Sequence, residues 1–411
     1  MPSIFRLLLI LTIFFFVRIA QGEELTITTE FKPDAASPNI TDFVNITPES
    51  GWCTNPNFTS RCRADNYFSL LTNITATQRV LDHASNDNRQ HTYQRVNGEW
   101  RTIKLVDRAT RREIEVQFRL FLVAYRFNSS SSNLPIPNFN AAGIDPLGGC
   151  EGGGAVGHSS QLPRYAFAWI HPAQVSTCYK KVLNMQHYDL NVDDVSIAYA
   201  IKSVSPMTLP NGNFTGSVTY SVGQGKDIDL GDAVYDDDKL TFNIQSIIQH
   251  QLEVKHLGSN KLELKPKKGW DEWSTSGDTQ ARLEAEANMT IVASSAVSVS
   301  AQCDNQILNY CALKKDDEDV YVGVNMALTV PGMYDRETGE AINDKFMPMY
   351  AVNTPGMIMV PHNPINTVST IKFWVDEISS MRMLQYPGST WRTTVTLLFD
   401  ADIFLPTSAS N

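Results

Sequence analysis

The sequence predicts an all-β protein composed of two β-sandwich domains. Three observations support this: apolar and polar residues alternate along many segments, turns rich in Gly, Pro and Asn separate those segments, and few segments have the spacing of an amphipathic helix. The chain of 411 residues is also longer than one hydrophobic core usually organises. About two domains are therefore expected.

Alternation is clearest over residues 281–293, where apolar residues occupy every second position. A period of two is typical of a strand with one buried and one solvated face. The same pattern recurs at residues 114–122, 218–222, 320–330, 371–375 and 391–403. These segments favour antiparallel β-sandwiches.

The first 22 residues have the pattern of a signal peptide. Arg6 supplies a positive charge, residues 7–17 form an apolar run, and small residues follow up to Gly22. The run is too short to cross a bilayer. We therefore expect an exported mature protein that begins at Glu23.

The chain is acidic, with a formal net charge of −10 that becomes −12 when Arg6 and Arg18 leave with the signal. An acidic chain is a poor candidate for binding nucleic acid or an anionic membrane surface. Neutral partners such as glycans, or other proteins, are expected instead.

The six cysteines fall into three groups that are local in sequence. An even number in an exported protein predicts disulfides. The spacing favours the pairs Cys53 with Cys62, Cys150 with Cys178, and Cys303 with Cys311. A zinc site at His158, His171 and His187 is the alternative for the histidines of this region, but no C-x-x-C spacing accompanies them, so no metal is expected.

An acidic stretch at residues 225–238 predicts the domain boundary, because charged, low-complexity segments are typical of exposed linkers. The expected domains are residues 1–22 as signal peptide, 23–232 and 239–411 as folded domains, and 233–238 as the linker. A calcium loop at Asp227, Asp229, Asp232 and Asp238 is less favoured, since the glycine is misplaced for an EF-hand.

No enzyme signature is complete. The segment from Gly157 to Gln161 lacks the final glycine of a nucleophile elbow, and the glycine-rich run at residues 148–154 lacks the Lys-Ser/Thr of a phosphate-binding loop. The prediction is a protein without catalytic residues or cofactors. A secreted carbohydrate-active enzyme remains the weaker alternative, and it would need two facing carboxylates. The available carboxylates are Glu99, Glu113, Glu115 and Asp145.

Aromatic residues beside polar ones are the main indication of a glycan site. Sugar C–H faces stack on aromatic rings, while sugar hydroxyls need polar partners. For each aromatic residue taken singly, core packing is the alternative. The candidate ligand-binding residues are Trp52, Trp100, Arg101, Asp145 and Trp169.

Three stretches resemble enterobacterial fimbrial-like adhesins of the chaperone–usher class. The first is an F-x-P segment at Phe31 to Pro33, followed by the motif N-x-T-P-x-S-G-x-C from Asn45 to Cys53, then Cys62 and Phe68-Ser69. The second is the block of Gly149-Cys150, Trp169-Ile170 and Cys178-Tyr179. The third is Tyr386-Pro387-Gly388-Ser389 leading into the alternating residues 395–400, which is similar to the last strand of a pilin domain.

The resemblance implies an N-terminal receptor-binding, lectin-like domain and a C-terminal pilin domain with an incomplete immunoglobulin-like fold. The missing seventh strand would leave a groove lined by Trp391, Val395, Leu397 and Phe399. A periplasmic chaperone would fill the groove first, and an adjacent minor pilin subunit would then replace it by donor-strand complementation. An outer-membrane usher would export the assembly.

The function that follows is a fimbrial tip adhesin, exported through the periplasm to the bacterial cell surface, that binds a host glycan or glycoprotein receptor. The alternative is a structural or initiating minor subunit without a ligand. Residues 25–31 alternate as a donor strand would, but we assign them to the first strand of the receptor-binding domain. Residues 405–411 extend beyond the last strand, whereas subunits of this class usually end close to it.

Overall fold

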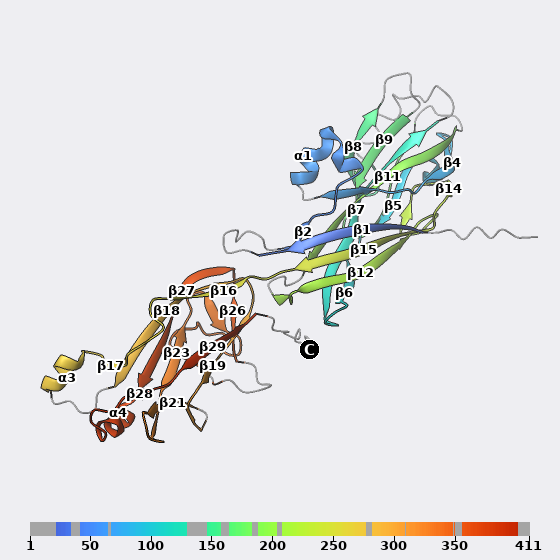
Figure 1. The fold of residues 1–411 in the computed structure, drawn as a ribbon. Coiled ribbons are helices and arrows are strands. Elements are labelled where there is room, and N and C mark those ends of the chain that lie inside the picture. Colours follow the sequence, from blue (N-terminus) through green and yellow to red (C-terminus); the bar gives the residue numbers. More distant parts are fainter. Residues whose placement is uncertain are drawn as a thin grey trace, which may run out of the picture.

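The computed structural model describes residues 22–33, 42–64, 67–129, 146–157, 164–182, 188–203, 208–276, 282–308, 310–347, 349 and 356–401. Strands dominate the described chain, which confirms the all-β prediction. The strands form two units that lie end to end (Figure 1). Each unit has its own hydrophobic core, the first within residues 27–248 and the second within residues 283–375. No helix in the described residues is long and apolar enough to span a membrane.

The N-terminal unit contains 15 described strands and three short helical segments. Their bounds are β1 (Glu23–Phe31), β2 (Val44–Asn45), η1 (Trp52–Thr54), α1 (Pro56–Ala64), β3 (Phe68–Leu71), β4 (Ala76–Leu81), η2 (Asn88–Gln90), β5 (Thr92–Asn97), β6 (Arg101–Asp107), β7 (Glu113–Asn128), β8 (Glu151–Gly157), β9 (Arg164–Ile170), β10 (Val175–Lys180), β11 (Tyr188–Ser203), β12 (Gly212–Ser221), β13 (Ile228–Asp229), β14 (Val234–Tyr235) and β15 (Lys239–Ile248).

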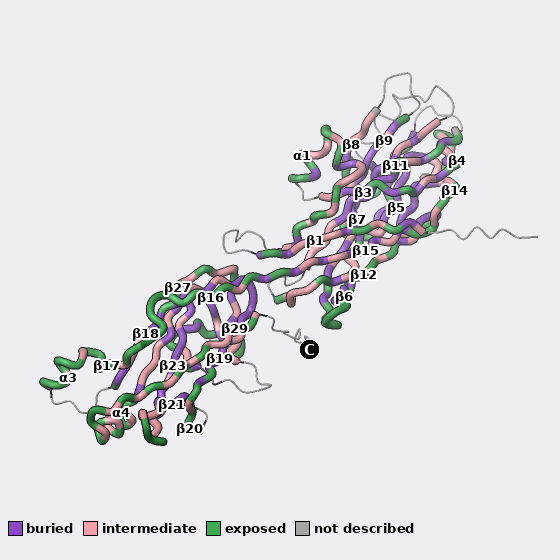
Figure 2. Tube along the Cα trace, in the orientation of Figure 1, coloured by how far each residue is buried: buried purple, intermediate pink, exposed green. Residues whose placement is uncertain are grey.

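One large sheet dominates this unit, with strand order β14-β4-β11-β7-β6-β12-β15-β1-β2. Strand β3 also pairs with β11, and β9 joins β8 to β7. A second sheet of three strands has the order β10-β5-β13. The long strands β7 and β11 lie side by side at the centre, where Phe118 and Tyr199 are completely buried. Burial is concentrated along the inside of the unit (Figure 2).

Strand β1 belongs to its own unit. It pairs in parallel with β15, from Glu23 opposite Leu240 to Phe31 opposite Ile248. Its alternate residues Ile27 and Phe31 are completely buried. The alternation that could have indicated a donor strand is therefore used inside the N-terminal unit.

The prediction that the acidic stretch forms an exposed linker is wrong, because this stretch packs into the N-terminal unit. Strand β13 pairs with β5, and β14 pairs with β4. Asp229 is completely buried, and its carboxylate accepts hydrogen bonds from Arg89 at 3.2 and 3.3 Å and from the Tyr235 hydroxyl at 3.0 Å. Buried carboxylates are tolerated when they are paired in this way. The central charge of this stretch is thus an internal partner rather than a solvated linker charge.

The boundary drawn at residue 239 is displaced for the same reason. Strand β15 pairs with β12 and β1 and so completes the N-terminal sheet. The chain passes to the second unit at His250 and Gln251. There Gln251 and Ser294 exchange two hydrogen bonds of 2.8 and 3.0 Å.

The C-terminal unit contains 14 described strands and two helices. Their bounds are β16 (Leu252–Leu257), β17 (Lys265–Pro266), α3 (Trp270–Ser276), β18 (Leu283–Ala293), β19 (Val297–Cys303), β20 (Gln306–Ile307), β21 (Tyr310–Lys315), β22 (Tyr321–Gly323), β23 (Asn325–Thr329), β24 (Met333–Asp335), β25 (Lys345–Phe346), β26 (Met357–Pro361), β27 (Ile365–Val375), α4 (Glu377–Leu384), β28 (Trp391–Arg392) and β29 (Val395–Asp400).

Three sheets surround the second core. The first has the order β16-β18-β27-β23-β25, with β17 also on β18, and the second has the order β24-β26-β19-β29. The third joins β20, β21 and β22, with β28 also on β21. A disulfide between Cys303 on β19 and Cys311 on β21 connects the second and third sheets. The segment expected as one strand at residues 391–403 is divided: in its described part, residues 391–401, β28 and β29 belong to separate sheets.

Replacing Asp229 by Ala should lower the free energy of unfolding by about 3 kcal/mol, because Arg89 would keep a charge without its buried partner. The matched control is Asp238→Ala, which removes an exposed carboxylate at the end of the same stretch and should change stability by less than about 0.5 kcal/mol. Urea unfolding of the full chain measures both. Equal, small effects would mean that the stretch is a solvated linker after all.

Candidate functional site

The last described strand, β29, lies at an edge of the C-terminal core. It pairs with β19 on one side, from Val395 opposite Cys303 to Asp400 opposite Ser298. Among the described residues no strand pairs with its other side. An edge of this kind presents a row of backbone groups that can pair with another strand.

The register shows which residues of β29 offer their backbone groups to that open side. Opposite residues in an antiparallel ladder alternate between hydrogen-bonded and non-hydrogen-bonded pairs. The Asp304 amide donates to the Thr394 carbonyl at 3.1 Å, so Thr394 belongs to a hydrogen-bonded pair. Counting by two along an unbroken register, Val395, Leu397 and Phe399 direct their N–H and C=O groups away from β19.

The same three residues contribute their side chains to the core. Val395, Leu397 and Phe399 pack against the second hydrophobic cluster, yet each is only half-buried. On the neighbouring strand β19, by contrast, Val297, Val299 and Ala301 are completely buried. The core is therefore covered beneath β19 and incompletely covered beneath β29.

Trp391 lies outside this edge, which corrects its expected place in the groove. It belongs to β28, which pairs with β21. Its indole N–H donates to the Ser389 hydroxyl at 2.8 Å, and its ring lines a pocket of about 300 Å³ with Trp270, Trp273 and Met383. The chain changes sheets between Trp391 and Val395, so only the last three of the four predicted groove residues share one edge.

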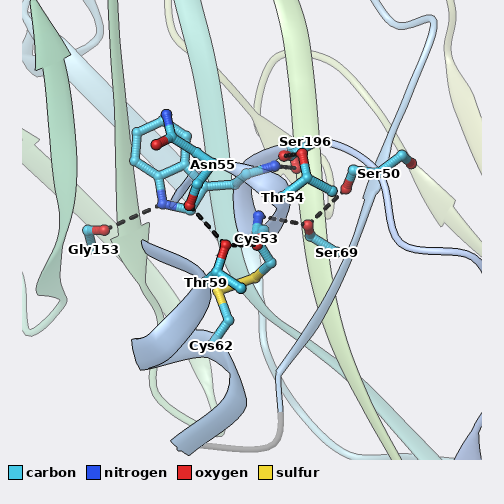
Figure 3. The surroundings of a disulfide bond; sticks show 11 residues. Ser50, Cys53, Thr54, Asn55, Thr59, Cys62, Ser69, Gly153 and Ser196 are labelled. Atoms are coloured by element: carbon cyan, nitrogen blue, oxygen red, sulfur yellow. Dashed lines mark hydrogen bonds between the residues drawn. A yellow bond between two sulfur atoms is a disulfide. The ribbon is translucent and has the colours of Figure 1, made fainter. Parts of the chain in front are cut away.

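In the N-terminal unit, the motif around the first disulfide is an anchor. The Cys53 amide donates to the Ser69 hydroxyl at 2.9 Å, and that hydroxyl donates to the Ser50 carbonyl at 2.7 Å (Figure 3). Gly51 has φ of +78°, and a Cβ there would lie 2.3 Å from the Ser196 hydroxyl oxygen. These contacts hold α1 against the large sheet, and the Cys53–Cys62 disulfide secures it.

Two of the predicted ligand-binding residues are core residues. Trp169 is completely buried and packs on Phe167 with ring centroids 5.0 Å apart, so the prediction that it contacts a ligand is wrong. Trp52 is only 7% exposed; its ring stacks on Phe58, and its indole N–H donates to the Gly153 carbonyl at 3.3 Å. For both residues the core-packing alternative describes the structure.

Arg101, Asp145 and Trp100 are the other three predicted ligand-binding residues. Arg101 is occupied by Asp227 at 2.7 Å and by the Thr219 carbonyl at 2.8 Å. Asp145 lies outside the described residues. Trp100 is half-buried, and two cations approach its ring: Lys202 Nζ lies 4.3 Å and Arg119 Cζ 5.6 Å from its centroid.

The sequence does not identify Arg119 and Lys202 as candidate ligand-binding residues. Arg119 occupies one of the outward-facing polar positions of the strand predicted at residues 114–122. In the sequence it therefore looks like any charged residue on a solvated face. Only the pairing of β7 with β11 brings these two residues to one face.

Cys150, His171 and Cys178 are the one group of ligand-type side chains that the described residues bring within metal-binding range. The two cysteines form a disulfide, so neither offers a thiolate. His171 is instead hydrogen-bonded: Nε2 lies 2.9 Å from Gln94 Oε1 and Nδ1 lies 2.7 Å from the Ser176 hydroxyl. The Gln94 amide donates to the Val123 carbonyl at 3.1 Å, which turns Oε1 toward His171. We therefore assign the proton of neutral His171 to Nε2.

The His171 side chain is buried, and this burial lowers its pKa to about 3. His171 therefore stays neutral in the folded chain at pH values below about 6.5, where the same side chain becomes protonated in the unfolded chain. The contribution of neutral His171 to the free energy of unfolding is complete above pH 6.5 and is lost as the pH falls toward 3.

Comparisons with solved structures give fimbrial tip adhesins. A chaperone–tip adhesin complex of CFA/I fimbriae is 10% identical, with 92% of this chain and 96% of that chain covered and a TM-score of 0.26. A point mutant of the CFA/I adhesin CfaE of enterotoxigenic E. coli is 11% identical, with 92% of each chain covered and a TM-score of 0.24.

The CsuC–CsuE chaperone–tip subunit complex of Acinetobacter baumannii Csu pili is also 11% identical, with 92% and 98% covered and a TM-score of 0.24. Scores this low carry no argument about this chain. No protein family and no curated protein matches the sequence.

Replacing His171 by Leu should make stability less dependent on pH. The variant loses two hydrogen bonds and should be less stable at pH 7.5. As the pH falls from 6.5 to 4, however, its free energy of unfolding should decrease less steeply than that of the wild type. The two slopes should differ by up to about 1.4 kcal/mol per pH unit. Urea unfolding at several pH values measures both slopes. Parallel slopes would contradict the assignment of a depressed pKa to His171.

Proposed function

We propose that this chain is a fimbrial tip adhesin whose C-terminal unit is completed by a strand from another protein. One observation carries the proposal: Val395, Leu397 and Phe399 combine outward-facing backbone groups with half-buried core side chains. A strand added beside β29 would satisfy the backbone groups and cover the side chains in the same step. This is the physics of β-strand addition.

The proposed donors are a periplasmic chaperone, followed by an adjacent minor pilin subunit at the outer-membrane usher. The place of β1 supports a position at the tip. A subunit within the fibre must lend an N-terminal strand to its neighbour, whereas β1 is held along its whole length by β15. The protein would then accept a strand and present its N-terminal unit to a host glycan or glycoprotein at the cell surface.

A strand supplied in cis should stabilise the C-terminal unit. We would join a seven-residue strand of alternating apolar residues to Asn411 through a flexible linker. Covering three half-buried apolar side chains should contribute on the order of 3 kcal/mol, which raises the unfolding temperature by roughly 5 to 10 °C. Differential scanning calorimetry of the full chain measures the change.

The matched control carries serine in place of the apolar residues of the added strand, and its unfolding temperature should stay that of the parent chain. A second pair of variants tests the position of the strand. Leu397→Asp should abolish the gain because it places a charge in the core contact, whereas Thr396→Asp, on the exposed face of β29, should keep it. If the apolar strand gives no gain in any form, the C-terminal core is already complete and the proposal fails.

Co-expression in a periplasm tests the partner directly. The full chain should accumulate as a one-to-one complex with a chaperone of the chaperone–usher class, and deletion of residues 395–411 should abolish that complex. A chain that is stable and monomeric alone would instead favour a free-standing binding protein or a secreted enzyme.

A further inference from the structure

The outer face of the large N-terminal sheet carries two cations on neighbouring strands. Arg119 on β7 lies opposite Ala200 of β11, and Lys202 of β11 lies opposite Gln117 of β7. Opposite residues share a face of a sheet, as do residues two apart on one strand. Arg119 and Lys202 are therefore diagonal neighbours, and both face away from the core that Phe118 and Tyr199 fill from the other side.

Trp100 completes this group. The β6–β7 ladder pairs Arg101 with Phe118, so Trp100 stands one position beyond it, beside Arg119. Both cations lie within cation–π distance of its ring, at 4.3 Å for Lys202 and 5.6 Å for Arg119. Next to them the ring of Phe121 lies 5.7 Å from the Arg119 guanidinium and 3.8 Å from the ring of Tyr67.

Neither cation has an ion-pair partner within the described residues. Two other arginines on strands of this unit do have carboxylate partners: Arg126 contacts Asp193 and Asp194, and Arg101 contacts Asp227. The chain has 44 acidic and 34 basic residues, so carboxylates are plentiful. What sets Arg119 and Lys202 apart is that the two cations are adjacent on one face and share the ring of Trp100.

Arg119 uses little of its hydrogen-bonding capacity. Its guanidinium has five N–H donors, and one of them donates to the His171 carbonyl at 3.0 Å. Burial lowers the pKa of Arg119, so the charge is held at a desolvation cost that a bound anion would offset. The Asp42 carboxylate interacts electrostatically with Lys202, but its Oδ1 accepts hydrogen bonds from the amides of Phe43 and Ser203.

We infer that Arg119, Lys202 and Trp100 form a saccharide-binding site on this face and that its ligand carries an anionic group, a carboxylate or a sulfate. The Arg119 guanidinium binds the anion through paired hydrogen bonds, and Lys202 adds a second positive charge. The half-buried Trp100 and the half-buried Tyr67, whose ring rests on the buried Phe121, supply an apolar surface for the C–H face of the sugar. This inference rests on the proposed adhesin function and names the class of its receptor.

The test is glycan binding by the full chain that carries the added apolar strand. Sialylated, uronic-acid-containing, sulfated and neutral glycans are compared at about 50 and about 300 mM salt, a range over which screening of exposed charges increases. Acidic glycans should bind more tightly than their neutral counterparts, and higher salt should weaken the binding. Loss of binding after sialidase treatment identifies a carboxylate ligand, and loss after desulfation identifies a sulfate ligand.

Three variants assign the site. Arg119→Gln and Lys202→Gln should each weaken binding of the acidic glycan about tenfold, as expected for the loss of a hydrogen bond or ion pair to a charged group. Lys104→Gln is the matched control, since Lys104 is exposed on β6 of the same sheet and is paired with Glu113 at 3.6 Å. It should leave binding unchanged. Calorimetry checks folding, and Lys202→Gln, which removes a cation without an ion-pair partner among the described residues, keeps the test valid if Arg119→Gln unfolds.

The inference is overturned if neutral and acidic glycans bind equally, if no glycan binds, or if Lys202→Gln behaves like Lys104→Gln. These failures are distinct from failure of the proposed function, because strand complementation of the C-terminal unit is measured without any glycan. A chain that gains stability from the added strand but binds only neutral glycans would remain an adhesin with its receptor site elsewhere.

Discussion

The edge of β29 that no described strand covers is the constraint on which the rest of the structure's interpretation depends. A sandwich core is most stable when its edge strands are short, protected or paired and every inward side chain is covered. At β29 both conditions fail at the same three residues, because the backbone and the side chains of Val395, Leu397 and Phe399 all meet the open side. A single added strand would correct both deficits at once, which is why we propose that this edge accepts a strand from another chain.

The N-terminal unit is built in the opposite way. In its large sheet β1 is held by β15, and the acidic stretch that follows β12 is drawn in by Asp229, Arg89 and Tyr235. The buried histidine His171 and the disulfide beside it fix the loop ends against β7 and β5. A unit held by these pairings can keep one face of its sheet rigid, and a rigid face is what a recognition surface requires.

Much of the fold follows from local pattern. A period of two identifies β7, β18, β27 and β29 without reference to anything distant, and the cysteine spacing indicates the three disulfides. What local pattern does not contain is pairing at long range. Asp229 falls in the acidic stretch that was expected to mark the domain boundary, because its partner Arg89 lies 140 residues away. Trp169 is a plausible ligand residue because a buried and an exposed tryptophan look alike in sequence. Arg119 and Lys202 become neighbours only through the β7–β11 register.

Residue-resolved amide hydrogen exchange of β29 tests the central claim most directly. In the free chain the amides of Val395, Leu397 and Phe399 should exchange rapidly, while those of Thr396, Leu398 and Asp400, which face β19, should be protected. Adding the apolar strand should protect the first three and leave the others unchanged. Equal protection of all six amides in the free chain would mean that the edge is already covered, and the strand-accepting function would then have no structural basis.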